Sequence, residues 1–240
     1  AAGRECFAGA PAAGFVYGGH RRIDRDGRSL GGNIYHPIGP EAYRDLLRGN
    51  PIGMHGAVMY DRARLVASGG FDPTLPRCED YDTYLRMARL LPVASHPEIV
   101  AEYRWHGSNM SSNHREMLNW VLRVLRREAR HAFAGSETAG EWRHGRQFWR
   151  RYYAEQILDA TQENWARGRS FTLAARGVIQ AMTSCPPIAI SRVVQIARQH
   201  LARLLPGGVV YRLKRLQGKR PPPPLGSVSF GDLDSVVPIS

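Results

Sequence analysis

Residues 69–86 have the sequence GGFDPTLPRCEDYDTYLR, which combines a turn, a short loop and the start of a helix. Gly69-Gly70 and Asp72-Pro73 predict the turn, because a residue that precedes proline is kept out of the helical region. From Asp80 onward the apolar positions recur at helical spacing, so we predict a helix that begins near this residue. The predictions for the rest of the chain are made relative to this turn and helix.

Three carboxylates lie at the start of the predicted helix: Glu79, Asp80 and Asp82. One explanation is capping, with Asp80 as the N-cap and Asp82 in the first turn, where the helix dipole favours negative charge. The other is chemistry, because a helix N-terminus is a rigid place to hold a reactive carboxylate. Spacing alone leaves both explanations open, although Asp82 points a different way around the turn and is expected to be structural.

Length and composition favour a globular cytoplasmic protein. The 240 residues are 43% hydrophobic, enough for one large or two small domains. No apolar run reaches the length of about 18 residues that spans a membrane, and we find no signal-peptide pattern. Cys6, Cys78 and Cys185 are far apart, which predicts reduced thiols and no zinc site.

The net charge of +12 is concentrated in the second half of the chain. Residues 115–220 contain 20 Lys and Arg against 7 Asp and Glu, a net charge of +13, whereas the remainder carries −1. A basic block of this size suits an anionic surface, either lipid or nucleic acid.

In the first half, strands are predicted around Val16, Val58 and Val100, with short helices at 41–48 and 61–67. The first strand leads into an Asp-Gly hairpin turn at residues 24–27. Asp24-Arg25-Asp26 has the letters of a metal-binding Asp-x-Asp motif, but a hairpin turn beside arginines argues against that role.

The second half is predicted to be helical. Asn113 and Glu116 resemble a capping box that opens a helix with one apolar stripe. Further helices are expected at about 141–167, 170–183 and 191–205. Pro186-Pro187 is expected to end the helix at 170–183. The four prolines at 221–224 predict a stiff linker. The apolar tail after them is faintly similar to the lead-in of methyltransferase-like domains.

The Gly-Gly-Phe-Asp turn and the Glu-Asp-Tyr-Asp helix start resemble the acceptor-side motif of family 2 glycosyltransferases with the GT-A fold. In that family the Asp of Glu-Asp is the general base on the acceptor hydroxyl, and it matches Asp80. The resemblance implies that Glu79 orients the acceptor or the base. His55, between Gly53 and Gly56, falls in the segment that forms the acceptor pocket.

The segment from Tyr103 to Ser111 resembles the Tyr-Arg-x-His-x-x-x-x-Ser segment that follows the acceptor helix in this family. Arg104 and His106 are therefore expected on the donor diphosphate side, with His106 as a candidate metal ligand. Each candidate also has an ordinary explanation: Glu79, Arg104 and His106 as solvated loop residues, and His55 as a turn histidine.

The resemblance covers roughly residues 15–113 and implies an α/β fold: a partial GT-A half-domain with a Rossmann-like mixed sheet. We expect this acceptor-side half at 1–114, a basic α-helical segment at 115–206, and a linker with the start of another domain at 207–240. The sequence has no Gly-rich phosphate loop and no plausible Asp-x-Asp. We therefore expect this chain to be the C-terminal half of the enzyme and to be inactive alone.

By resemblance, the enzyme transfers a sugar with inversion from a nucleotide-sugar donor to a glycan or lipid-linked acceptor, using Mg²⁺ or Mn²⁺. It is expected to be peripheral on the inner membrane face. The main alternative is a non-enzymatic basic helical module that binds an anionic membrane surface or a protein. No nucleic-acid partner is expected, because the block lacks a binding motif and its aromatic residues fall largely on apolar stripes.

Overall fold

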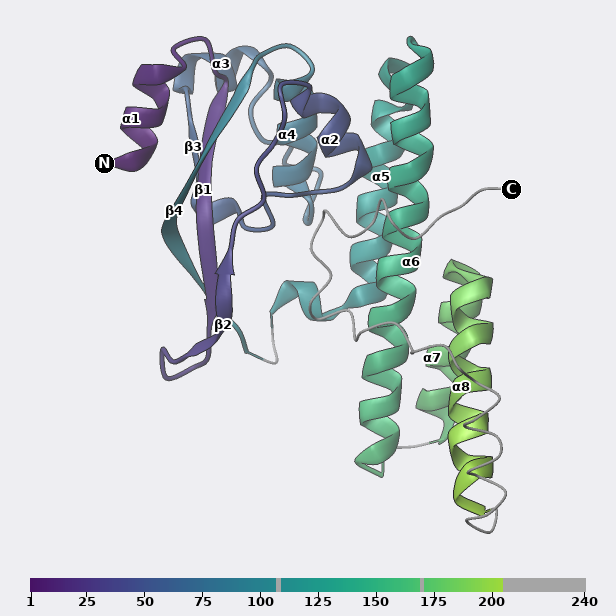
Figure 1. The fold of residues 1–240 in the computed structure, drawn as a ribbon. Coiled ribbons are helices and arrows are strands. Elements are labelled where there is room, and N and C mark those ends of the chain that lie inside the picture. Colours follow the sequence, from purple (N-terminus) through teal and green to yellow (C-terminus); the bar gives the residue numbers. More distant parts are fainter. Residues whose placement is uncertain (107–108, 169–170, 205–240) are drawn as a thin grey trace, which may run out of the picture.

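The computed structural model describes residues 1–106, 109–168 and 171–204 (Figure 1). It shows a mixed α/β protein whose first half contains a four-stranded open sheet and whose second half is helical. The elements in chain order are α1 (Ala2–Gly9), β1 (Phe15–Ile23), β2 (Ser29–Ile34), α2 (Ala42–Arg48), the 3-10 helix η1 (His55–Ala57), β3 (Val58–Tyr60), α3 (Arg62–Ala67), α4 (Glu79–Ala88), β4 (Val93–Arg104), the 3-10 helix η2 (Met110–Ser112), α5 (His114–Ala132), α6 (Ser136–Ala166), α7 (Phe171–Ser184) and α8 (Pro186–Leu204).

Strand β1 is the centre of the sheet and pairs along both of its edges. β4 runs parallel to it, from the pair Phe15 and Val93 to the pair Ile23 and Arg104. The other edge is shared by two antiparallel strands, with β3 beside residues 15–17 and β2 beside residues 20–23. Residues 15–20 of β1 are all buried, as a central strand requires. The strands predicted around Val16, Val58 and Val100 are thus confirmed as parts of one mixed sheet.

The predicted hairpin turn between β1 and β2 is confirmed. The Asp24 carboxylate accepts hydrogen bonds from the backbone N–H groups of Asp26 (2.9 Å) and Arg28 (2.8 Å). Asp24 therefore stabilises the turn in the way that aspartates commonly do.

The main core lies between the sheet and the helices α2, α4, α5 and the first half of α6, which Figure 1 shows on one side of the sheet. Its fully buried side chains include Phe15, Tyr17, Leu46, Tyr84 and Leu125. Because this core joins the sheet to α5 and α6, the boundary expected at residue 114 does not separate two cores. Helix α1 lies on the other side of the sheet (Figure 1).

A second, smaller core holds the end of α6 against α7 and α8. Its buried members are Ala154, Ile157, Leu158, Ala181 and Ala189. Small residues at these positions let the helices approach closely: Gly177 of α7 packs against Thr161 of α6, where even an added Cβ would collide with the threonine side chain.

The start of α4 differs from the prediction. The helix begins at Glu79, and its N-cap is Cys78 rather than Asp80. Cys78 adopts a left-handed backbone conformation (φ 58°), which turns the chain into the helix one residue earlier than expected. Asp80 is consequently the second helical residue and Asp82 lies in the first turn, as predicted.

The structure also places other helix and strand boundaries differently from the prediction. β4 begins at Val93 rather than at Pro97, and α6 begins at Ser136 rather than near 141. α7 ends at Ser184, just before Pro186-Pro187 as predicted, whereas α8 begins at Pro186 rather than near Ser191, because proline fits the first turn of a helix, where its missing N–H is not needed. Helix α1 was not predicted.

Residues 205–240 lie outside the described residues, together with Gly107 and Ser108 of the loop after β4. The predicted linker and the segment at 207–240 therefore fall outside the structure that we describe. Within the described part, no helix is both long and apolar enough to cross a membrane.

Candidate active site

The start of α4 points toward the carboxyl end of the parallel strands. Only four residues, 89–92, connect the end of α4 to the start of β4, so the helix runs back alongside the sheet. Its N-terminus, with Glu79 and Asp80, therefore faces the end of the sheet where β1 and β4 finish. Tyr84, one turn after Asp80, lies beside Phe15 at the start of β1 (5.4 Å between ring centroids), so the start of α4 lies alongside the sheet rather than beyond its end.

Asp80 is partly buried, and one of its carboxylate oxygens accepts a hydrogen bond from the backbone N–H of Tyr81 (2.7 Å). Burial raises the pKa of the Asp80 carboxyl, and the neighbouring charge of Glu79 raises it further. The hydrogen bond from Tyr81 and the nearby His55 act in the opposite direction. A carboxylate with a raised pKa is a better proton acceptor than an ordinary aspartate.

An aromatic cluster lies beside Asp80. The ring centroid of His55 is 5.2 Å from that of Phe71, 5.9 Å from that of Tyr60 and 6.5 Å from that of Tyr84. Burial raises the pKa of both tyrosines, and the charge of Asp80 contributes in each case. The structure thus brings together Asp80, Glu79 and His55, three of the residues that the sequence predicted for the acceptor site.

The hydroxyl groups of Tyr60 and Tyr84 are the feature of this cluster that sequence analysis missed. Both oxygens are buried, and the two hydroxyls lie close enough that each affects the pKa of the other through a side-chain hydrogen bond. Tyr84 falls at the spacing of a core residue of α4, and its ring does belong to the core. Its hydroxyl adds a polar group beside Asp80 that this spacing does not predict.

Arg104 and His106 occupy a different part of the sheet edge. The Arg104 guanidinium donates to the backbone carbonyl groups of Asp24 (3.1 Å) and Arg25 (2.7 Å), so it holds the β1–β2 turn. The backbone N–H of His106 donates to the side chain of Asn109 (2.6 Å), which orders the loop after β4. The convergence of Asp80 and His106 on one cavity stays a prediction.

Two other acidic side chains are buried as parts of ion pairs. Asp82 pairs with Arg86 (2.8 Å) and with Arg127 (3.5 Å), which gives it the structural role expected from the sequence. Glu128 pairs with Arg89 (3.0 Å) and accepts a hydrogen bond from the hydroxyl of Tyr43 (3.0 Å). These pairs neutralise the two acidic side chains that are fully buried, whereas the partly buried Asp80 has no ion pair among the described residues.

The described residues do not fit a metal ion. Among them, no group of three or more His, Cys, Asp or Glu side chains lies close enough together to hold one. His106 alone does not make a site, since divalent ions need several ligands.

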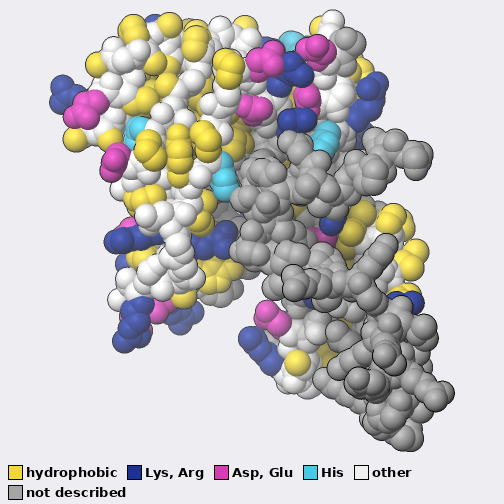
Figure 2. Space-filling view, in the orientation of Figure 1, with side chains coloured by type: hydrophobic (Ala, Val, Ile, Leu, Met, Phe, Trp, Pro, Cys, Tyr) yellow, Lys and Arg dark blue, Asp and Glu magenta, His cyan; other side chains and the backbone are white. Residues whose placement is uncertain are grey.

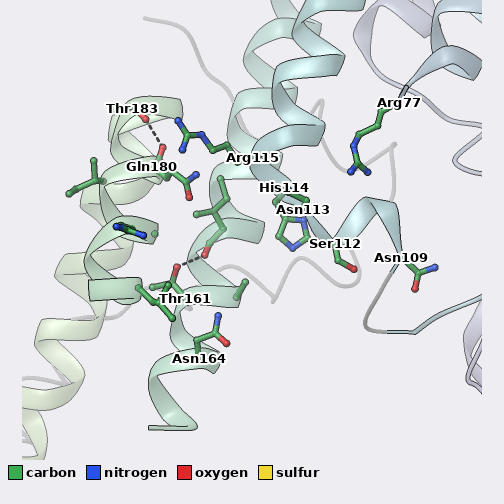
Figure 3. Close-up of a pocket in the computed structure, with 16 residues that line it drawn as sticks. Arg77, Asn109, Ser112, Asn113, His114, Arg115, Thr161, Asn164, Gln180 and Thr183 are labelled. Atoms are coloured by element: carbon green, nitrogen blue, oxygen red, sulfur yellow. Dashed lines mark hydrogen bonds between the residues drawn. The ribbon is translucent and has the colours of Figure 1, made fainter. Parts of the chain in front are cut away.

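A large cleft opens beside this cluster, between the loop before α5 and the helices α6 and α7 (Figure 3). Its volume is about 1000 Å³ and its lining includes Arg77, which lies three residues before Asp80. Sequence analysis missed this cleft because its walls come from residues about one hundred positions apart.

The sequence matches no protein-family model and gives no significant match among curated proteins. The function must therefore be argued from the residues themselves.

Proposed function

We propose that this chain forms the acceptor side of an inverting glycosyltransferase of GT-A type, with Asp80 as the general base. The observation that carries the proposal is the environment of Asp80: a carboxyl with a raised pKa, at a helix start, beside His55 and two buried tyrosine hydroxyls. Asp82 and Glu128 are fully buried and paired with arginines, whereas Asp80 is partly buried and has no ion pair among the described residues. That difference supports a chemical role rather than a purely structural one.

In the proposed reaction, an acceptor hydroxyl binds to the Asp80 carboxylate and gives it a proton. The hydroxyl oxygen attacks the anomeric carbon of the donor sugar as the bond from that carbon to the diphosphate oxygen breaks. Attack from the opposite face inverts the configuration. Glu79 and His55 position the acceptor, and the rings of Phe71 and Tyr60 offer an apolar surface for a sugar face.

The donor is expected to be a nucleotide sugar, and the acceptor a surface glycan or a lipid-linked glycan. We propose a cytoplasmic location, peripheral on the inner membrane face. The metal ion and the nucleotide-binding half remain expectations from the family resemblance.

The test compares two aspartates at helix starts. Asp80→Asn in a protein that carries this chain with a nucleotide-binding half should lower turnover by about 10²- to 10⁴-fold and preserve donor binding. The matched control is Asp61→Asn, because the Asp61 side chain caps α3 by accepting from the N–H of Arg64 (2.9 Å), and Asn caps nearly as well. Turnover is followed by release of nucleoside diphosphate from a panel of nucleotide sugars. Similar turnover in both variants would assign Asp80 to the helix start alone.

A second function, docking on an anionic membrane surface, is favoured by the outer faces of α7 and α8. Large apolar side chains on these helices are exposed, among them Phe171 (73%), Ile190 (52%) and Val194 (42%). Hydrophobic side chains are visible at the outer edge of this part of the molecule in Figure 2. Arg198 of α8 is exposed as well, a composition that suits an interfacial helix.

A further inference from the structure

The cleft between the loop before α5 and the helices α6 and α7 has a strongly biased lining. Arg77, Arg115 and Arg176 contribute three guanidinium groups, and no Asp or Glu belongs to the described lining. Figure 3 shows Arg115 directed toward Gln180 and Thr183 of α7, with Arg77 on the opposite side of the opening. A cleft with this charge selects anions.

Two of the three guanidinium groups are available to a ligand. Arg77 pairs with Glu116 (3.0 Å), whereas Arg115 and Arg176 form no ion pair within the described part of the chain. Both of these side chains are exposed, so they can reorient toward a ligand without breaking an existing pair. Arginine is well suited to phosphate oxygens, because its planar fork makes two parallel hydrogen bonds.

The start of α5 adds to the positive potential of the cleft. Asn113, His114 and Arg115 lie at this N-terminus, and the Asn113 side chain caps the N–H of Glu116. The helix has 19 residues, so its positive end is fully developed there. Burial lowers the pKa of His114, opposed by the charge of Asp159, so the imidazole is neutral near pH 7 and the arginines carry the charge.

The floor of the cleft differs from its rim. Ile157, Ala160 and Leu173 provide apolar surface, and Thr161, Asn164 and Gln180 provide hydroxyl and amide groups. The Thr161 hydroxyl donates to the carbonyl of Ile157 (2.7 Å), which leaves its oxygen able to accept. This combination of apolar surface, amides and hydroxyls suits the faces and hydroxyl groups of a saccharide.

The cleft is adjacent to the proposed active site at two points. Arg77 belongs to the loop that leads into Asp80. The ring of His114 lies 6.4 Å from that of Tyr153, whose raised pKa reflects burial first and then the charges of Cys78, Tyr152 and Asp80. Arg77 and His114 therefore connect the cleft, through the loop before α4 and through Tyr153, with the segment that carries Asp80.

We propose that this cleft binds the phosphate group of a phosphorylated saccharide, with Arg115 and Arg176 as the anion-binding residues. The proposal rests on the proposed function, since it identifies the acceptor as a phosphate-bearing glycan. The phosphate can be free in solution or part of a lipid headgroup, and the same guanidinium groups serve both.

The probe is inorganic pyrophosphate, whose binding to the 240-residue chain is measured by titration calorimetry at low and at high salt. The double variant Arg115→Ala/Arg176→Ala should weaken binding by about tenfold or more, because it removes both guanidinium groups that are free to bind the phosphate oxygens. Parallel titrations with phosphatidylglycerol and phosphatidylcholine vesicles distinguish a headgroup from a soluble phosphate.

The charge-matched control is Arg126→Ala/Arg150→Ala, which removes two exposed arginines outside the cleft. It should bind pyrophosphate like the unmodified chain, and circular dichroism confirms that both variants are folded. Equal weakening in the two double variants, or none in either, would overturn the proposal. Asp80→Asn should leave pyrophosphate binding unchanged, so the cleft and the general base can fail independently.

Discussion

The sheet region, residues 1–153, and the helical region, residues 154–204, are stabilised in different ways. The core of the sheet region contains large side chains such as Phe15, Tyr84 and Leu125. The core of the helical region consists of three alanines with Ile157 and Leu158, while Phe171 and Ile179 remain exposed. Because stabilisation scales with the apolar area that is buried, the sheet region holds most of the stability. The helical region instead presents apolar and cationic surface to other molecules.

The largest expected effect is on folding stability, and it distinguishes an ion pair of the sheet region from one of the helical region. Asp82→Ala should lower the free energy of unfolding by about 3 kcal/mol, because it leaves the partly buried Arg86 guanidinium without its carboxylate partner, whereas Arg127 keeps its pair with Asp72. Asp159→Ala removes the exposed partner of Arg192 in the helical region and should cost less than about 1 kcal/mol. Urea denaturation of both variants measures the difference. Equal losses would contradict the contrast between the regions.

A second comparison uses two glycines at helix contacts. A Cβ at Gly145 would collide with the backbone carbonyl of Leu47 in α2, which cannot move freely, so Gly145→Ala should cost about 1 to 3 kcal/mol. A Cβ at Gly177 would collide with the side chain of Thr161, which can rotate away. Alanine gains about 1 kcal/mol of helix propensity at both positions, so the atoms that the new Cβ meets decide the difference, and Gly177→Ala should cost less.

The control for the glycine comparison is Thr161→Ala. Combined with Gly177→Ala it removes the colliding side chain, so the pair should be more stable than Gly177→Ala alone. Thermal melting of the four variants tests this order. A Gly145→Ala protein as stable as the Gly177→Ala protein would show that α2 and α6 are not in fixed contact.

A smaller effect is expected at membranes. Co-sedimentation should recover more protein with anionic than with neutral vesicles at low salt, since each basic residue near such a surface contributes about 1 kcal/mol. Phe171→Ser in the helical region should reduce that recovery. Val66→Ser is the control, because Val66 is equally exposed (68%) but lies in the sheet region. Equal recovery in the supernatant with anionic and with neutral vesicles, at low and at high salt, would rule out the membrane function.

The smallest expected effect is the pH dependence of folding stability that His20 contributes. Burial, with the charges of Arg22 and His36, lowers the pKa of His20 in the folded protein. As pH falls below about 6.5, His20 is therefore protonated in the unfolded chain before it is protonated in the folded protein. The folding stability that is present above that pH is lost as pH falls through the folded-state pKa of His20. His20→Asn should flatten this part of the stability curve, measured as the urea midpoint from neutral to mildly acidic pH. An unchanged curve would contradict this assignment.

Much of the fold was predictable because local patterns decide it. The Asp-Gly turn, the apolar stripe of α5 and the strands around Val16 and Val58 follow from short-range periodicity. The start of β4 was missed because Pro97 suggests a strand end. The structure keeps Pro97 inside β4, beside an irregularity in its pairing with β1, where the missing N–H is tolerated.

The site was predictable only in part. Asp80, Glu79 and His55 lie on two nearby segments, and both segments have sequence motifs that resemble those of a known family. The buried hydroxyl of Tyr84 has the same spacing as a core residue, so no sequence pattern identifies it. The cleft depends on the packing of α5, α6 and α7, which no local pattern specifies.

Helix α6 gives these two regions a mechanical connection. Its 31 residues form one rod of about 46 Å whose first turns are fixed against α2 and α5 and whose last turns carry α7 and α8. Tyr153, which touches the ring of His114, lies between these two ends. Because α6 is continuous from Ser136 to Ala166, the two cores are joined by hydrogen-bonded backbone rather than by a linker, and a displacement of α7 and α8 would be transmitted along this helix to the residues around Tyr153.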